Sequence, residues 1–194
     1  MSKTIPMSRR ITPFQLIIMG FAGVILLGAL VLMLPLSARS GTVTPFGDAL
    51  FTATSAVCVT GLVVQDTASY WSGFGQAVIL LLIQIGGLGV ITVAASFALL
   101  SGRKISLMQR SAMQEAIAAP QMGGIVRLTG FILRMTLTIE IIGALVMLPV
   151  FCHDYGARGV WMAVFHSISA FCNAGFDLMG TKEAPYVSLM GYAR

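Results

Sequence analysis

The chain has 194 residues, of which 57% are hydrophobic and 10% are charged, with a formal net charge of +5. A soluble domain carries roughly 25% charged residues, so the composition excludes a cytosolic enzyme domain, a nucleic-acid-binding module and a disordered chain. The mean hydropathy of +0.90 instead predicts an all-α integral membrane protein, because helices satisfy their own backbone hydrogen bonds in lipid.

Three apolar stretches are long enough to cross a hydrocarbon core, which takes about 20 helical residues. They predict spanning helices over residues 14–36, 74–100 and 128–151. The first stretch exceeds the roughly 7–15 apolar residues of a signal peptide, and no small-residue cleavage site follows it. We therefore expect a multi-pass protein that keeps its first helix.

The basic residues predict the orientation, because lysine and arginine near the ends of spans favour the cytoplasmic side. Most of them lie before the first span or between the second and the third. This places residues 1–12 in a cytoplasmic tail and residues 101–124 in a cytoplasmic connector. Within the connector, Met108, Ala112 and Ala116 recur at helical spacing and predict a short helix that lies at the membrane surface or touches a soluble partner.

Most carboxylates then fall on the outer side of the membrane. They are Asp48, Asp66, Asp154, Asp177 and Glu183. In that position they would raise the local concentration of cations. Solvation of the outer loops would account for them equally well.

Two outer segments, residues 45–62 and 159–176, are too apolar for loops in water and too short to cross the membrane and return as full helices. Each begins like a helix and then changes to β-branched, small or polar residues that end in glycine. A helix followed by irregular backbone at membrane depth is typical of a re-entrant pore loop, which must line a cavity or be buried in protein.

The two segments are copies of one unit. When Gly61 is set on Gly175, four further pairs are identical: Phe51 with Phe165, Ser55 with Ser169, Ala56 with Ala170, and Cys58 with Cys172. The same register sets Leu34-Pro35 on Leu148-Pro149. The sequence therefore predicts a helix–pore-loop–helix (M-P-M) repeat over residues 13–100 and a second one, lacking its last helix, over residues 125–194. Repeats that run in the same direction are parallel and pseudo-symmetric about the membrane normal.

This arrangement points to an ion filter. A short helix that enters from outside directs the negative end of its dipole at the middle of the membrane, and the backbone carbonyls after it can replace the hydration shell of a monovalent cation. The candidate filter residues are Cys58, Val59, Thr60, Gly61, Cys172, Asn173, Ala174 and Gly175. We expect the ion to bind their carbonyls.

Side chains in and near the loops have less specific interpretations. No second soft ligand stands near either cysteine, so a small buried residue is favoured over a transition-metal ligand. The Asn173 amide faces the ion path or, as we favour, braces the neighbouring loop. His166 is expected to be buried and hydrogen-bonded, and His153 to lie in a solvated loop.

Polar and small residues inside the spans are expected to hold helices together. Gln76 and Gln84 share one helix face and predict a polar seam toward other pore elements. Glu140 is expected to meet a donor on another helix, as a brace rather than a cation site. Gly86, Gly87 and Gly89 favour close helix packing over a gating hinge.

The loop sequences resemble one known family. Residues 48–62 and 165–177 are similar to the pore loops of the Trk/Ktr/HKT superfamily of potassium transporters, and specifically of its KtrB-like membrane subunit. Residues 84–91 resemble the inner helix of that family's first repeat, and residues 102–107 resemble the basic connector after it. The resemblance covers nearly the whole chain.

The resemblance implies four M-P-M repeats around one pore, as in K+ channels, and a homodimer of the full-length protein in the bacterial plasma membrane, with a cytoplasmic N-terminus. A glycine in each filter loop marks potassium selectivity in that family, and Gly61 and Gly175 match it. A separate cytoplasmic regulatory ring of RCK type, which binds nucleotides, is also implied. We accordingly expect the pore-forming subunit of a potassium uptake system and not an enzyme. It would hold no cofactor in this chain, with K+ as the transported ion and Na+ as a candidate coupling ion.

Two alternatives stay open. An ion-coupled secondary carrier of another solute also uses broken helices, but it would need a charged partner for its substrate, and the filter stretches contain no lysine or arginine. A non-conducting fragment is the other alternative, since the chain stops before the last helix of the second repeat. We expect either an N-terminal part of a longer protein or a truncated gene.

Overall fold

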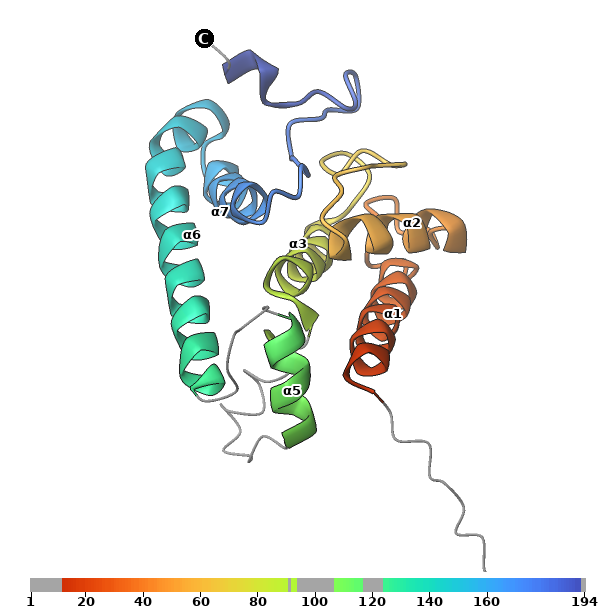
Figure 1. The fold of residues 1–194 in the computed structure, drawn as a ribbon. Coiled ribbons are helices and arrows are strands. Elements are labelled where there is room, and N and C mark those ends of the chain that lie inside the picture. Colours follow the sequence, from red (N-terminus) through yellow and green to blue (C-terminus); the bar gives the residue numbers. More distant parts are fainter. Residues whose placement is uncertain (1–11, 91, 94–106, 117–123, 193–194) are drawn as a thin grey trace, which may run out of the picture.

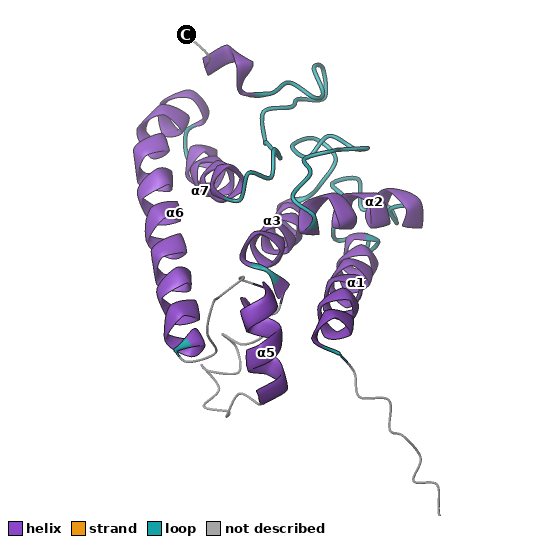
Figure 2. Cartoon of the chain, viewed as in Figure 1, coloured by secondary structure: helices purple, strands orange, loops and turns teal. Residues whose placement is uncertain are grey.

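The computed structural model describes residues 12–90, 92–93, 107–116 and 124–192, which form a helical protein (Figures 1 and 2). The described residues contain no strand, only an isolated bridge between Ala38 and Trp71. The helices are α1 (Pro13–Leu32), α2 (Phe46–Val57), α3 (Gly73–Leu88), α5 (Leu107–Ala116), α6 (Ile125–Tyr155), α7 (Arg158–Phe171) and the 3-10 turn η1 (Leu189–Tyr192). In Figure 1, α1 and α6 lie at opposite sides with α3 and α5 between them.

The helices α1 and α6 are long and apolar enough to cross a membrane. Their outer surfaces carry large exposed apolar side chains such as Ile18, Leu27 and Val146, the last of which is 71% exposed. In water such a surface would be unfavourable, whereas in lipid it is the expected outer face. The described residues thus hold two helices of spanning length, and not the three that the sequence predicts.

The ends of the spans differ from the prediction. α1 ends at Leu32 rather than at residue 36, because the chain turns there and the Ser37 hydroxyl donates to the Val31 carbonyl at 2.7 Å. α6 continues through Pro149 to Tyr155 instead of ending at residue 151, although Pro149 removes one helical hydrogen bond. Leu34-Pro35 and Leu148-Pro149 therefore do not occupy equivalent helix ends.

α3 is shorter than the predicted second span. It has 16 residues and ends at Leu88, because the next residue, Gly89, has a φ of +82° that lies outside the helical region. The prediction that Gly89 serves close packing within a continuous helix is therefore wrong. Residues 94–100 of the predicted span lie outside the described residues. α5 confirms the predicted short helix in the connector. It packs against α1 and α6, and its Ala112 and Met113 are fully buried.

α2 and α7 lie inside the two segments that the sequence singles out. With 12 and 14 residues they are about 18 and 21 Å long, too short for a hydrocarbon core of about 30 Å. α2 packs a face of small residues, including Ala49, Ala53 and Ala56, against its neighbours α1 and α3.

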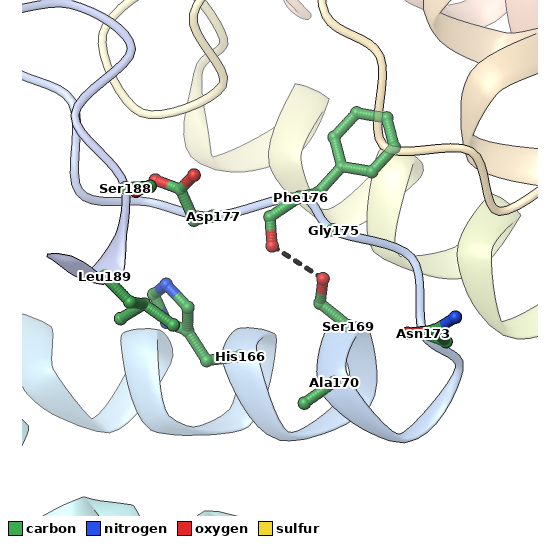
Figure 3. Close-up of a pocket in the computed structure, with 9 residues that line it drawn as sticks. All are labelled: His166, Ser169, Ala170, Asn173, Gly175, Phe176, Asp177, Ser188 and Leu189. Atoms are coloured by element: carbon green, nitrogen blue, oxygen red, sulfur yellow. Dashed lines mark hydrogen bonds between the residues drawn. The ribbon is translucent and has the colours of Figure 1, made fainter. Parts of the chain in front are cut away.

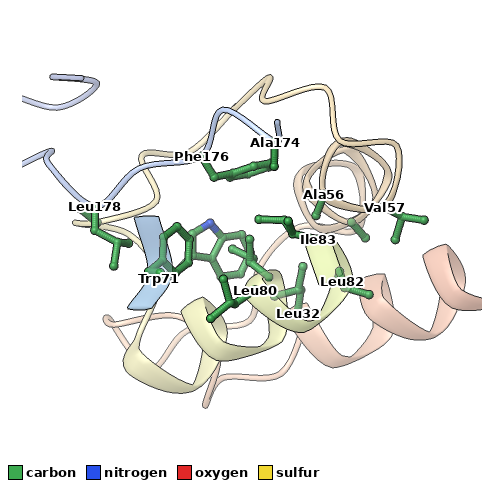
Figure 4. Packing of buried hydrophobic residues seen from close by; sticks show 14 of the residues in the cluster. Leu32, Ala56, Val57, Trp71, Leu80, Leu82, Ile83, Ala174, Phe176 and Leu178 are labelled. Atoms are coloured by element: carbon green, nitrogen blue, oxygen red, sulfur yellow. The ribbon is translucent and has the colours of Figure 1, made fainter. Parts of the chain in front are cut away.

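One hydrophobic core joins the two halves of the chain (Figure 4). α3 lies at its centre, with Ile79 and Ile83 fully buried beside Trp71. Ala174 and Phe176, which belong to the segment after α7, cover this core from the outer side. The second half of the chain therefore completes the core of the first half.

Candidate functional site

The loops after α2 and α7 have the same backbone conformation. The Thr60 amide donates to the Ser55 carbonyl at 3.0 Å, and the Ala174 amide donates to the Ser169 carbonyl at 2.7 Å. Cys58 and Cys172 are the C-caps of their helices. The repeat in the sequence is thus also a repeat in the backbone hydrogen bonds.

Left-handed residues recur at equivalent places in both loops. Val59 and Asn173 have φ values of +53° and +56°, and Gly61 and Gly175 have +72° and +73°. Asparagine tolerates this conformation better than most residues, whereas a β-branched valine there is a genuine outlier that costs about 1–3 kcal/mol. Such local strain is typical of functional sites, where the surrounding structure holds it.

The two loops lie against each other at their glycines. A Cβ atom on Gly61 would stand 2.6 Å from the Ala174 carbonyl oxygen, and a Cβ atom on Gly175 would stand 3.4 Å from the Gly61 Cα. The structure therefore brings together residues 58–61 and 172–175, which the sequence selects as filter candidates from two distant segments. Gly61 has no room for any side chain.

α2 and α7 are each bonded to the loop that follows them through an equivalent serine. The Ser55 and Thr60 hydroxyls are 2.9 Å apart, and the Ser169 hydroxyl donates to the Phe176 carbonyl at 2.6 Å (Figure 3). His166 adds a second tie: its Nδ1 donates to the Met162 carbonyl and its Nε2 accepts from the Leu178 amide at 3.2 Å. The expectation of a buried, hydrogen-bonded His166 is confirmed.

A hollow of about 590 Å³ lies beside the second loop, between Asn173, Gly175 and Asp177 on the loop and His166 and Ser169 on α7 (Figure 3). The Asn173 side chain is exposed at its edge and makes no hydrogen bond with the described part of the chain. The expected brace toward a neighbouring loop therefore stays a prediction. Asparagine suits this position because it tolerates the left-handed backbone conformation.

The cysteines differ from each other despite their equivalent positions. Cys172 is half-buried against α3, where a Cβ atom on Gly87 would stand 2.5 Å from its Sγ, but Cys58 is exposed. The expectation that both are small buried residues is wrong for Cys58, because no described helix covers its side of α2. Within the described residues, no three His, Cys, Asp or Glu side chains gather as metal ligands.

α3 connects the two loops, as the predicted polar seam requires. Gln76 Oε1 accepts from the Trp161 indole of α7 at 2.9 Å, and Gln84 Nε2 donates to Glu140 Oε2 of α6 at 3.0 Å. Gly86 lies directly against the backbone of Val57, the last residue of α2. The predictions of a seam, of a donor for Glu140 and of close packing at Gly86 are confirmed.

The acidic residues that the sequence predicts on the outer side of the membrane have different environments. Asp66 is buried and structural: it accepts from the Ser69 amide and hydroxyl and, at 2.9 Å, from the Tyr186 amide. Asp177 is half-buried beside the hollow, and burial raises the pKa of its carboxyl despite a bond from the Met179 amide. His153 is exposed as expected, but it lies in the last turn of α6 and not in a loop. Its Nδ1 pairs with Asp154.

Sequence reasoning missed two residues that join the halves of the site. Tyr186 reaches back over the first loop, where its amide binds Asp66 and its hydroxyl donates to the Val64 carbonyl at 3.0 Å. Trp161 binds Gln76 across the core. Trp161 has a weak sequence signal, since it is a rare tryptophan near the start of α7. Tyr186 has none.

Comparison with known proteins gives matches over almost the whole chain. The TrkH family, described as cation transport proteins, matches residues 4–190. Potassium/sodium uptake protein NtpJ of Enterococcus hirae is 46% identical over 173 residues, which are 89% of this chain and 38% of that protein. Ktr system potassium uptake protein B of Bacillus subtilis is 44% identical over 181 residues, 92% of this chain and 40% of that protein.

A third relative, Ktr system potassium uptake protein B of Vibrio alginolyticus, is 38% identical over 175 residues, which are 90% of this chain and 38% of that protein. The chain thus spans about two fifths of the length of the curated relatives it matches. The two loops and α3 between them all lie inside the matched region.

Proposed function

Because the chain belongs to the TrkH family of cation transport proteins, we propose that it forms the first two pore-loop units of the potassium-translocating subunit of an uptake system in the plasma membrane. The names of the three relatives, two potassium uptake proteins and one potassium/sodium uptake protein, support this assignment. The observation that carries it is the contact between Gly61 and the second loop, where two copies of one backbone conformation meet.

The proposed filter uses peptide oxygens and no side-chain metal ligand. α2 and α7 each end at a cysteine C-cap, so their negative dipole ends face the start of the stretches 58–61 and 172–175. Carbonyls along these stretches replace the water around K+. The left-handed backbone at Val59, Gly61, Asn173 and Gly175 supports this role, since it changes the direction of successive carbonyls.

The proposed arrangement is an M-P-M unit over residues 13–100 and part of a second over residues 125–194, parallel and related by an axis along the membrane normal. α1 and α6 supply the outer helices, and their apolar faces support contact with lipid. The N-terminus is cytoplasmic. In the full-length protein further units complete the pore, two copies form a homodimer, and a separate cytoplasmic ring of RCK type regulates it.

Expression of the full-length gene in a bacterial strain without potassium uptake tests the proposal. We expect growth at low external K+ and uptake of radioactive Rb+ that K+ inhibits. Uptake of an organic solute with no Rb+ uptake would contradict the proposal and favour a carrier. Absence of any flux from purified protein in vesicles would favour a non-conducting subunit.

Asp177 is expected to make uptake sensitive to external pH. Because burial raises its pKa, the carboxyl takes up a proton at pH values where an exposed aspartate, with a pKa of about 3.9, is still charged. Protonation removes a negative charge beside the second loop. We expect the apparent KM for K+ to rise about fivefold on acidification, the effect of roughly 1 kcal/mol of lost attraction.

Initial rates of uptake against K+ concentration, taken over a series of external pH values, measure this effect. Asp177→Asn should show the high KM at every pH and no further response to acid. Glu183→Gln, which changes an exposed outer carboxylate, is the matched control and should keep the response. A pH response that persists in Asp177→Asn would assign the titration to another group.

A further inference from the structure

A buried carboxylate on α6 is connected to the second filter loop through one side chain of α3. Glu140 is only 5% exposed and lies within the apolar stretch of α6 that is long enough to span a membrane. Its Oε2 accepts from Gln84 Nε2 at 3.0 Å, while its Oε1 has no hydrogen-bond partner among the described residues. All the side-chain hydrogen bonding of this carboxylate in the described structure is therefore directed at Gln84.

The other end of the Gln84 amide faces the filter. Its Oε1 accepts from the Cys172 thiol at 3.8 Å, and Cys172 is both the C-cap of α7 and the first residue of the second filter stretch. Oε2 of Glu140 is the acceptor in this bond, and an amide carries its NH2 donors and its acceptor oxygen on separate atoms. Glu140 therefore holds the NH2 group of Gln84 toward α6, which leaves the amide oxygen directed at Cys172.

α7 packs closely against both α6 and α3 at this level, so it links the two helices that hold Glu140 and Gln84. The Ser167 hydroxyl of α7 donates to the Glu140 carbonyl at 2.6 Å. Cβ atoms on Gly87 and Gly143 would each stand 2.5 Å from the Cys172 Sγ and the Ser167 Oγ, respectively. Cys58, at the equivalent position of the first loop, is exposed, so this arrangement acts on the second loop alone.

A purely structural contact would not need a carboxyl group here. An unpaired polar atom buried in an apolar environment is costly, and two apolar side chains would fill the same space without that cost. What the carboxylate adds is a fixed orientation of the Gln84 amide. We infer that Glu140 and Gln84 are positioning residues that hold Cys172, and with it the second filter stretch, in the geometry that distinguishes K+ from Na+; this inference rests on the proposed function.

A double-mutant cycle in the full-length protein tests the inference. In Glu140→Gln the new amide can donate as well as accept, so it no longer fixes the orientation of the Gln84 amide. In Cys172→Ala the thiol donor is absent. Each variant should lower the ratio of K+ to Na+ uptake about threefold, as expected for one weak hydrogen bond. Because both act through Gln84, the double variant should lose no more than either single variant.

The ratio is measured per amount of folded protein, together with KM and maximal rate, so that lower expression does not imitate the effect. Cys172→Ser restores a donor and should retain the ratio. Thr138→Val is the matched control on α6, since the Thr138 hydroxyl is exposed and, among the described residues, binds only the Arg134 carbonyl of its own helix; it should leave the ratio unchanged.

The outcomes separate this inference from the proposed function. An unchanged ratio in Glu140→Gln and Cys172→Ala, or losses that add in the double variant, would overturn the positioning role while K+ uptake by the unaltered protein upholds the proposed function. An unaltered full-length protein that takes up no K+ would overturn both.

Discussion

Replacing Gly61 with serine in the full-length protein is expected to lower the ratio of K+ to Na+ uptake by about tenfold or more. Two effects combine. A Cβ atom at residue 61 would stand 2.6 Å from the Ala174 carbonyl oxygen, so the second filter stretch must move. The φ of +72° also disfavours any residue with a side chain, by about 1–3 kcal/mol, and each 1.4 kcal/mol corresponds to a tenfold change.

A matched control separates the filter from backbone strain. Gly41 has almost the same conformation, with φ of +71°, but a Cβ atom there would meet nothing within 4 Å. Gly41→Ser should therefore cost some stability and leave the K+ to Na+ ratio unchanged. Gly175→Ser should be milder than Gly61→Ser, because its Cβ atom would contact only the Gly61 Cα, at 3.4 Å.

Competition between K+ and Na+ for Rb+ uptake in the complemented strain gives these ratios. Equal ratios for Gly61→Ser and the unaltered protein would contradict a filter at this place. Equal losses in Gly41→Ser and Gly61→Ser would instead attribute the effect to folding.

Replacing Gly86 with alanine is expected to prevent a large share of the protein from folding. At this residue α3 touches the backbone of Val57, the last residue of α2, so that a methyl group would overlap the Val57 carbonyl. Backbone cannot move aside as a flexible side chain can. Overpacking of this kind costs typically about 1–3 kcal/mol, and here the displaced segment leads directly into the first filter stretch.

Two measurements on the detergent-solubilised full-length protein report this loss: the temperature of thermal unfolding and the fraction of protein that elutes as a single species. Gly130→Ala is the matched control, because Gly130 is also helical and a Cβ atom there would meet no described residue within 4 Å; it should be neutral or slightly stabilising, since alanine favours helices over glycine. A Gly86→Ala protein as stable as the Gly130→Ala protein would show that α3 and α2 are not in backbone contact.

The pore-loop pair is the part of the site that the sequence predicts best. Helical character followed by small residues and a glycine selects the segments that contain α2 and α7, and the register of Gly61 on Gly175 matches the shared φ angles of the two loops. Local structure of this kind can be predicted from sequence because short-range hydrogen bonds, such as those from the Thr60 and Ala174 amides, determine it.

Features that depend on distant partners could not be predicted. The partial burial of Cys172 depends on its contact with Gly87 of α3, whereas its counterpart Cys58 is exposed. Hydropathy alone also placed helix ends too late in α1 and too early in α6, since Pro149 is accommodated within a helix. The partnership of Asp66 with Tyr186 has no local signal at all.

That last contact has a consequence for biosynthesis. Asp66 and the Tyr186 amide are 120 residues apart in the chain, and ribosomes add about 5–20 residues per second. The first half therefore waits about 6–24 s before its buried aspartate receives this donor. During that interval Asp66 has only Ser69 to bind among the partners described above, so the contacts of this buried side chain are completed only after the second half of the chain is made.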